Sequence, residues 1–244
     1  MTTQSTASTS VVLAAVVVGA AVVGAGLALG GYFVGDGLYA ARASERYVTV
    51  KGLAEREVPA NLAMWPLVFT TAADDLDALQ AEVDANVERI EGFLRPEFAP
   101  EELTLSVPRI TDNWAQSSAG MRPAFRYAAE VTLTLRTSKV GAVLAAMARS
   151  GELVKAGVPL IRSYEYQPEF LFTDLERIKP EMIAEATRDA RRAAEQFAQD
   201  SASAVGAIRN AQQGYFSIDD RDRFSPEHKK VRVVTTVQYF LVDD

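Results

Sequence analysis

The sequence contains no cysteine and only one histidine among its 244 residues. The absence of cysteine excludes disulfide bonds, thiol chemistry and cysteine-ligated metal sites. A single histidine also excludes a site built from several histidines. His228 lies among Glu227, Lys229 and Lys230, so we expect an exposed side chain rather than a catalytic base. The sequence predicts no catalytic residue, no cofactor site and no metal site.

Clustered positive charge is also missing. The chain has 25 Lys and Arg against 32 Asp and Glu, a net charge of −7. Proteins that bind nucleic acids neutralise phosphates with grouped basic side chains, so nucleic acid is excluded as an expected partner. The acidic group Asp219, Asp220 and Asp222 is interleaved with Arg221 and Arg223, which predicts a solvated charged loop rather than a cation site.

The N-terminal region carries a long apolar run. No charged residue occurs from Val11 to Gly35, and such a helix is long enough to cross the roughly 30 Å hydrocarbon core of a bilayer. The run is longer than the ~7–15 apolar residues of a cleaved signal, so we predict an uncleaved transmembrane signal anchor. This divides the chain into a polar tail (1–10), the anchor (11–35), a linker (36–46) and one folded domain (47–244).

Orientation does not follow from charge alone. The first ten residues have no Lys or Arg, whereas Arg42, Arg46 and Lys51 follow the span. The positive-inside rule then places the large domain in the cytoplasm, but large domains are translocated largely regardless of their charge.

The remainder of the chain has the pattern of an α+β domain in the order ββαββαβαββ. We expect a mainly antiparallel sheet with about three helices packed on one side. Predicted helices are Asp74–Arg95, Lys139–Arg149 and a long Ala-rich helix from about Ile178 to Gly206, with Pro180 in its first turn and Phe197 as an apolar anchor. Predicted strands are Tyr47–Leu53, Asn61–Thr71, Leu103–Val107, Phe125–Arg136, Leu160–Tyr166, Gln213–Ile218 and Lys230–Val242. Pro66 predicts an edge or a bulge in its strand, because proline cannot donate to a β-ladder.

Six apolar residues form a candidate interaction surface. Phe170, Leu171 and Phe172 lie in a turn-like segment and must be buried, either under the long helix or on another subunit. Trp114 lies in the loop Thr111–Pro123, where it serves either as a tether onto the domain or as a ligand platform. Val234 and Phe240 point away from the apolar face of the last strand, so helices or another subunit should cover both faces.

Three stretches then indicate a family. They are Tyr47-Val-Thr-Val-Lys-Gly-Leu-Ala-Glu-Arg-Glu-Val58, Lys179-Pro-Glu-Met-Ile-Ala-Glu-Ala-Thr187 and Lys230-Val-Arg-Val-Val-Thr235. Together with the Ala-rich helix segment Asp189–Ala198, they resemble the SIMPL-domain family of bacterial envelope proteins over about Tyr47 to Asp244. The resemblance implies a periplasmic, membrane-anchored location, ring-like homo-oligomers in some members, and links to envelope and oxidative stress. It implies no catalytic residues.

These observations lead to three hypotheses. The first is a non-enzymatic inner-membrane protein with a periplasmic, self-associating domain that acts as a scaffold or in a stress response. The second is a periplasmic ligand-binding module, or a component of a channel-like oligomer, holding a small molecule, peptide or lipid near Thr111–Pro123. The third and least favoured is an enzyme that uses His228 or Asp219 and Asp222.

Overall fold

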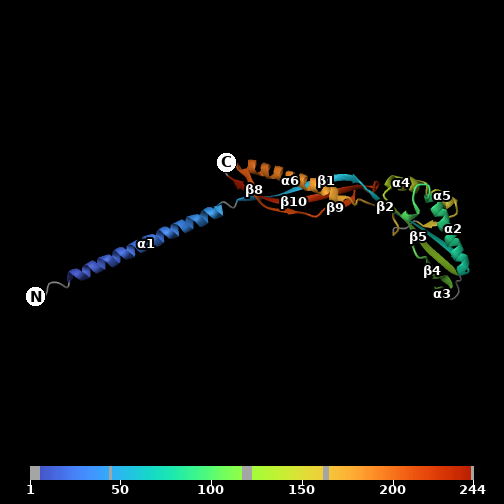
Figure 1. Cartoon of the computed structure of the whole chain (residues 1–244), viewed down its shortest axis with the longest axis horizontal. Helices are drawn as coiled ribbons and strands as arrows, with labels where there is room; N and C mark the ends of the chain where they lie inside the picture. Colours follow the sequence, from blue (N-terminus) through green and yellow to red (C-terminus); the bar gives the residue numbers. More distant parts are fainter. Residues whose placement is uncertain (1–5, 44–45, 117–122, 162–164, 243–244) are drawn as a thin grey trace. The chain divides into compact units, whose positions relative to one another are not determined.

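The computed structural model describes residues 6–43, 46–116, 123–161 and 165–242. Its helices are α1 (Thr6–Ala43), α2 (Leu76–Leu94), α3 (Asn113–Gln116), α4 (Val140–Ala148), α5 (Gly151–Lys155) and α6 (Leu175–Asp200), with a 3-10 turn at Pro100–Glu102. Its strands are β1 (Tyr47–Pro59), β2 (Leu62–Ala73), β3 (Leu103–Leu105), β4 (Arg109–Asp112), β5 (Tyr127–Thr137), β6 (Leu160–Ile161), β7 (Glu169–Leu171), β8 (Ala204–Gln213), β9 (Ser217–Asp220) and β10 (His228–Val242). Figure 1 labels most of these elements.

The chain separates into two compact units. One comprises Met1–Gly52, Thr187–Gln213 and Thr235–Asp244, and the other comprises Leu53–Ala186 and Gly214–Val234. Strand β1, helix α6 and strand β10 each contribute residues to both units.

Helix α1 contains the apolar run. Within it, Ala14–Gly35 has a mean hydropathy of 2.1 and is long and apolar enough to cross a membrane. The side chains of this stretch are exposed along the helix, as expected for a surface whose solvent is lipid rather than a protein core. The helix continues to Ala43.

The larger unit contains a six-stranded antiparallel sheet. Strands β3, β5, β2 and β6 follow in this order, β4 also pairs with β5, and β7 also pairs with β2. The N-cap of helix α2 is Asp75, whose side chain accepts a hydrogen bond from the Ala78 N–H over 2.8 Å. The first N–H groups of a helix have no partner within the helix, and this bond provides one for Ala78. Side chains of α2, α4 and α5 join those of β2 and β5 in one apolar core, and Figure 1 shows these three helices around the two strands.

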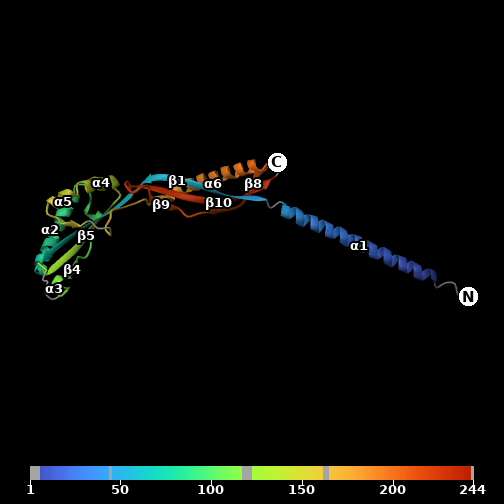
Figure 2. The same ribbon diagram turned by 180° about the vertical axis from the view of Figure 1, so that it is seen from behind.

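Helix α6 buries a row of small side chains. Ile178, Met182 and Ala186 pack with Val231 and Val233 of β10 in one apolar cluster. Further along the helix, Ala190 and Ala194 pack with Val237 and Tyr239 of β10 in another. Alanine lets a helix approach a sheet closely, and Figure 2 shows α6 running along β10. The sheet itself has the order β1, β10, β8, with β9 also on β10.

The predicted α+β class, its antiparallel pairing and the single apolar N-terminal helix are confirmed. The prediction of one sheet and about three further helices differs in number from the structure, since in the described residues the strands divide between two sheets and five α-helices follow α1. The extra helices α3 and α5 have four and five residues, too few to give a 3.6-residue pattern.

Several predicted boundaries around the long helix are also wrong. Helix α6 begins at Leu175, so Pro180 lies inside it rather than in its first turn. It ends at Asp200 instead of Gly206, and the chain continues at once into β8. Phe197, predicted as an anchor, is 58% exposed, whereas Ala198 is buried. A stripe made mostly of alanine has a weak contrast between its faces, which is why the part of the stripe after Ala190 was misplaced by one residue.

Candidate functional site

The segment Phe170–Phe172 is mostly buried within the chain. Phe170 is 3% exposed and belongs to the core beneath the six-stranded sheet, where β7 sets it opposite Ala63 of β2. Phe172 is 8% exposed and packs with Ile178 and Met182 of α6. Leu171, which points the other way on the strand, is 38% exposed. Only this middle residue is available to another molecule.

Trp114 is attached to the body of its unit. Its indole Nε1 donates to the Pro123 carbonyl oxygen over 3.4 Å. The Arg126 guanidinium lies 5.5 Å from the centroid of its ring, and is paired with Asp112 at 3.2 Å. Burial of Asp112 raises the pKa of its carboxyl, but hydrogen bonds from Ala115 N–H and from Arg126 outweigh this effect and lower it. Most of the loop after Trp114, residues 117–122, lies outside the described residues.

Val234 and Phe240 lie on the face of β10 opposite the row buried under α6, and both are half-buried. Phe240 faces Arg209, whose guanidinium lies 6.0 Å from its ring centroid and 4.1 Å from that of Tyr47. The Val234 carbonyl accepts the Gly214 N–H over 2.8 Å. The six predicted residues are thus distributed over α3, the β7 segment and β10.

Three of the charged groups considered as chemical candidates, His228, Asp220 and Asp222, each have a charged neighbour. The His228 Nδ1 lies 3.3 Å from a Glu227 carboxylate oxygen. Asp220 forms an ion pair with Lys229, and Asp222 pairs with Arg221 at 2.9 Å. The hydrogen bond from Arg221 lowers the pKa of the Asp222 carboxyl. Within the described part of the chain, no group of three or more His, Asp or Glu side chains is placed to hold a metal ion.

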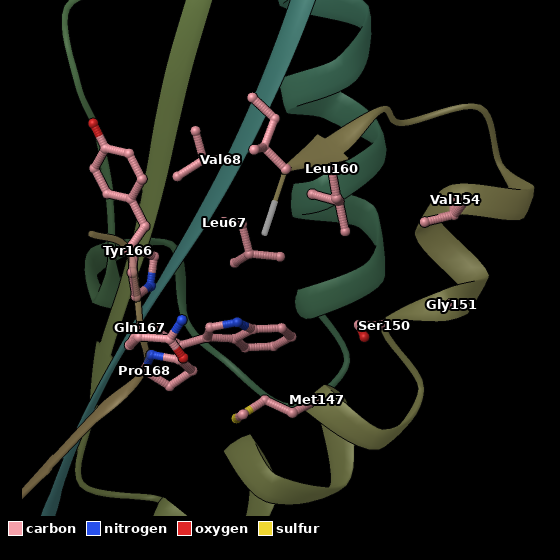
Figure 3. Close-up of a pocket in the computed structure, with 13 residues that line it drawn as sticks. Leu67, Val68, Met147, Ser150, Gly151, Val154, Leu160, Tyr166, Gln167 and Pro168 are labelled. Atoms are coloured by element: carbon pink, nitrogen blue, oxygen red, sulfur yellow. The ribbon is translucent and has the colours of Figure 1, made fainter. Parts of the chain in front are cut away.

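A pocket of about 510 Å³ lies beside β2 in the larger unit. This volume is in the range of ~300–1,000 Å³ that is typical of ligand sites. One wall comes from the end of α4 and from α5, and the opposite wall from Tyr166, Gln167 and Pro168 (Figure 3). Its floor consists of four consecutive β2 residues, Trp65 to Val68.

The pocket wall at Tyr166 is held by a hydrogen bond. The Tyr166 hydroxyl donates to a Glu130 carboxylate oxygen on β5 over 3.3 Å. The nearby negative charges of Glu165 and then Glu130 raise the pKa of this hydroxyl, which favours the protonated form that donates this hydrogen bond. Sequence reasoning missed the pocket. None of the lining residues named above comes from Thr111–Pro123, and Pro66 in its floor was the one local signal.

A family model described as SIMPL, protein of unknown function (DUF541), matches residues 48–239. The chain belongs to the SIMPL family. The resemblance predicted from its sequence stretches is thus confirmed. The match covers every strand of both sheets at least in part and ends within β10, while α1 lies before it. No curated protein matches the chain closely enough to be compared with it.

Proposed function

We propose that this chain is a non-enzymatic, membrane-anchored envelope protein whose SIMPL domain self-associates as a scaffold. The anchor is the apolar stretch of α1, which crosses the inner membrane once, and the domain after it lies in the periplasm. Support for the compartment comes from the resemblance to envelope proteins, and support for the anchor comes from the length and hydropathy of Ala14–Gly35. A role in an envelope or oxidative stress response is part of the same proposal.

The observation that carries self-association is the open edge of β8. This strand pairs with β10 on one side, and no strand of the described chain pairs with its other side. Its residues are exposed from Ala207 to Gln213. Natural edge strands are usually protected by charged side chains, especially lysine, by proline or by bulges. Strand β8 contains no lysine, proline or acidic residue, and its one charged side chain is Arg209. Outside Arg209 and the register shifts beside it, such an edge is a template for a strand from a second copy.

Two shifts in register further define the pairing segment. They fall near Ile208 in the ladder between β8 and β10, whereas Asn210–Gln213 pairs regularly with Thr235–Gln238. Bulges twist an edge away from a new partner, so the regular stretch Asn210–Gln213 is the part of β8 that we expect to pair between copies.

Charge placed on this stretch tests the proposal. Full-length protein in detergent should sediment as an oligomer, and Asn210→Lys with Gln212→Lys should weaken association at least tenfold by like-charge repulsion at the edge. Gln80→Lys with Ala81→Lys on the exposed side of α2 adds the same charge and should leave the sedimentation unchanged. A wild-type chain that remains monomeric at all concentrations, or equal effects of both double variants, would refute the edge as the interface.

The compartment of the SIMPL domain requires a separate experiment, because the Lys and Arg residues that follow the apolar run favour a cytoplasmic rather than a periplasmic domain. Alkaline phosphatase fused after Asp244 is active only where its disulfides form, outside the cytoplasm. We expect high phosphatase activity in membrane fractions. A second fusion at the same position, to a reporter that is active only in the cytoplasm, should be inactive. The reverse pattern would place the SIMPL domain in the cytoplasm.

A second candidate function, ligand binding, is favoured by the pocket beside β2 rather than by the Thr111–Pro123 loop. An enzyme that uses His228 or Asp219 and Asp222 has less support, since Asp222 is engaged in an ion pair with Arg221. Loss of a measured activity on substituting His228 would reverse this ranking.

A further inference from the structure

Trp65 carries a hydrogen-bond donor that the folded chain does not use. Its side chain belongs to the apolar core of the larger unit, and the residue is 7% exposed. Its indole Nε1–H makes no hydrogen bond to the part of the chain that the structure describes. The indole of Trp114, by contrast, donates to the Pro123 carbonyl oxygen. A tryptophan N–H inside a protein usually has a partner, so the free donor of Trp65 indicates a group that is supplied from outside the chain.

The free donor is open to the pocket beside β2. Among the described residues, the Thr235 hydroxyl oxygen is the one side-chain nitrogen or oxygen that lacks a partner and is also sealed from solvent. The Trp65 Nε1 lacks a partner but is not sealed, so it borders a space that water can enter. Trp65 lines the pocket of about 510 Å³, which provides that space for a nearly buried side chain.

A second free polar group lines the same pocket. Ser150 is the half-buried N-cap residue of α5, but its side chain makes no capping hydrogen bond. Two other polar side chains, in the seven-residue connection between β6 and β7, are already engaged. The Tyr166 hydroxyl donates to Glu130, and Gln167 has an interaction partner of its own. A ligand in the pocket therefore meets the free indole N–H and the free hydroxyl of Ser150.

The remaining lining determines the kind of ligand. None of the described residues that line the pocket is charged, so a charged ligand would lose its hydration without gaining an opposite charge. Apolar contacts are offered by Met147, by Leu160 and by Val154, which is 58% exposed (Figure 3). An indole N–H can only donate, so the ligand must bring a hydrogen-bond acceptor to Trp65.

We propose that the pocket binds a small, uncharged carbonyl compound with apolar groups beside the carbonyl. The carbonyl oxygen accepts the hydrogen bond from Trp65 Nε1–H, and the apolar groups contact Met147, Val154 and Leu160. A carbonyl brings an acceptor without a charge and without a donor that would itself need a buried partner. This binding rests on the ligand-binding candidate described above, and on neither the anchor nor self-association through β8.

The chain supplies matched variants for the test. A Cβ added at Gly151 or at Gly141 meets no atom within 4 Å, so both helical positions accept a larger side chain. Gly151 lines the pocket, whereas Gly141 is exposed on α4 and does not. Gly151→Phe should fill the pocket, and Gly141→Phe should leave it open. Trp65→Phe removes the indole N–H and keeps an aromatic ring, and thermal unfolding checks that each variant is folded.

The probes are alkyl phenyl ketones from acetophenone to hexanophenone. Each ketone is compared with the hydrocarbon in which a methylidene group replaces the carbonyl oxygen, and benzoate supplies a charged analogue of acetophenone. Isothermal titration calorimetry on the full-length protein in nanodiscs measures the affinities, with empty nanodiscs as the control for partition into lipid. The contact itself is observed by NMR in a Trp114→Phe background labelled with [15N]tryptophan, where Trp65 gives the only indole N–H signal.

We expect at least one ketone to bind saturably and to move the Trp65 indole proton resonance downfield. The matched hydrocarbon should bind about tenfold more weakly, because it leaves the N–H without a partner, and benzoate should not bind. Gly141→Phe should bind the ketone like the wild type, and Gly151→Phe at least tenfold more weakly. In Trp65→Phe, ketone and hydrocarbon should bind equally, a loss of discrimination that a change of pocket size alone does not produce.

Two kinds of failure can be told apart. If the hydrocarbon binds the wild type as tightly as the ketone, or if Trp65→Phe still discriminates between them, Trp65 does not recognise the carbonyl. This outcome overturns the proposal but leaves ligand binding in the pocket standing. If no ketone binds, or if Gly151→Phe binds as tightly as the wild type, the proposal is overturned together with the assignment of ligand binding to this pocket.

Discussion

Thr137 donates its hydroxyl hydrogen to Glu102 Oε1 over 2.5 Å, which joins the end of β5 to the turn before β3. The same carboxylate accepts the Ala99 N–H over 2.8 Å and lies 3.3 Å from the Lys139 ammonium. The bond from Thr137 lowers the pKa of Glu102 below its ordinary value of 4.5, although burial acts in the opposite direction. The ionised form of Glu102 is thus bound more strongly in the folded chain than in the unfolded chain.

A pH dependence of stability follows from this lowered pKa. The carboxylate stabilises the fold fully above pH 4.5, and this contribution is lost as the pH falls through the lower pKa of the folded state. Glu102→Gln should reduce the free energy of unfolding at pH 7 and flatten its decline as the pH falls below 4.5. Urea unfolding of the full-length chain at a series of pH values measures both effects. Glu101→Gln, at an exposed position, is the control, and an equal effect of both substitutions would contradict the assignment.

Thr235 presents the opposite situation from Thr137. Its hydroxyl oxygen is buried, and within the described part of the chain it has no hydrogen-bond partner. Because a buried polar atom without a partner costs free energy, Thr235→Val should stabilise the protein by about 1 kcal/mol. Thr137→Val removes a hydroxyl that is used and should destabilise it by about 1–3 kcal/mol. Urea unfolding followed by circular dichroism measures both, and a loss of stability in Thr235→Val would show that its hydroxyl has a partner.

Gly214 is required by a close approach of two strands. A Cβ at this position would lie 2.5 Å from the Val234 carbonyl oxygen, which itself accepts the Gly214 N–H. Gly214→Ala should therefore destabilise the chain by about 1–3 kcal/mol, because main-chain atoms must move. Gly141→Ala, in a helix with open space around the added methyl group, should stabilise by about 0.5–1 kcal/mol. The midpoints of urea unfolding of the two variants should move in opposite directions, and a shared direction would contradict the contact.

The small side chains on the buried face of α6 should resist enlargement. Ala194 is fully buried against β10, so Ala194→Leu should cost about 1–3 kcal/mol through overpacking. Phe197→Leu, one turn away at an exposed position, should change the free energy of unfolding by less than about 0.5 kcal/mol. Thermal and urea unfolding of the two variants checks the face of the helix, and a larger loss at Phe197 would mean that the helix is rotated.

Elements determined by local pattern were predictable from sequence. The helix predicted over Asp74–Arg95 is α2, and its apolar residues Leu79, Val83, Ile90 and Leu94 are buried as the spacing requires. The alternation in the last strand likewise places Val231, Val233 and Val237 on the face covered by α6. In both cases the signal lies within one element and needs no knowledge of its neighbours.

Elements determined by distant partners were not predictable. Strand β8 is rich in Ala and Gln and is mostly exposed, so its sequence shows neither alternation of apolar and polar residues nor a strong β-propensity. It forms a strand because β10 pairs with it. The pocket was missed for a related reason. Pro66 indicated an irregular ladder, but the cavity arises from the number of residues between β6 and β7, which becomes meaningful only when both strands are paired with β2.

The division of β1, α6 and β10 between the two units has a consequence for how the molecule can be taken apart. Neither unit is a continuous stretch of polypeptide, so no single proteolytic cut releases one from the other. A protease that nicks the exposed connection between β9 and β10 leaves two fragments that each retain segments of both units. Unfolding of the whole of one of these three shared elements would therefore remove a segment from each unit.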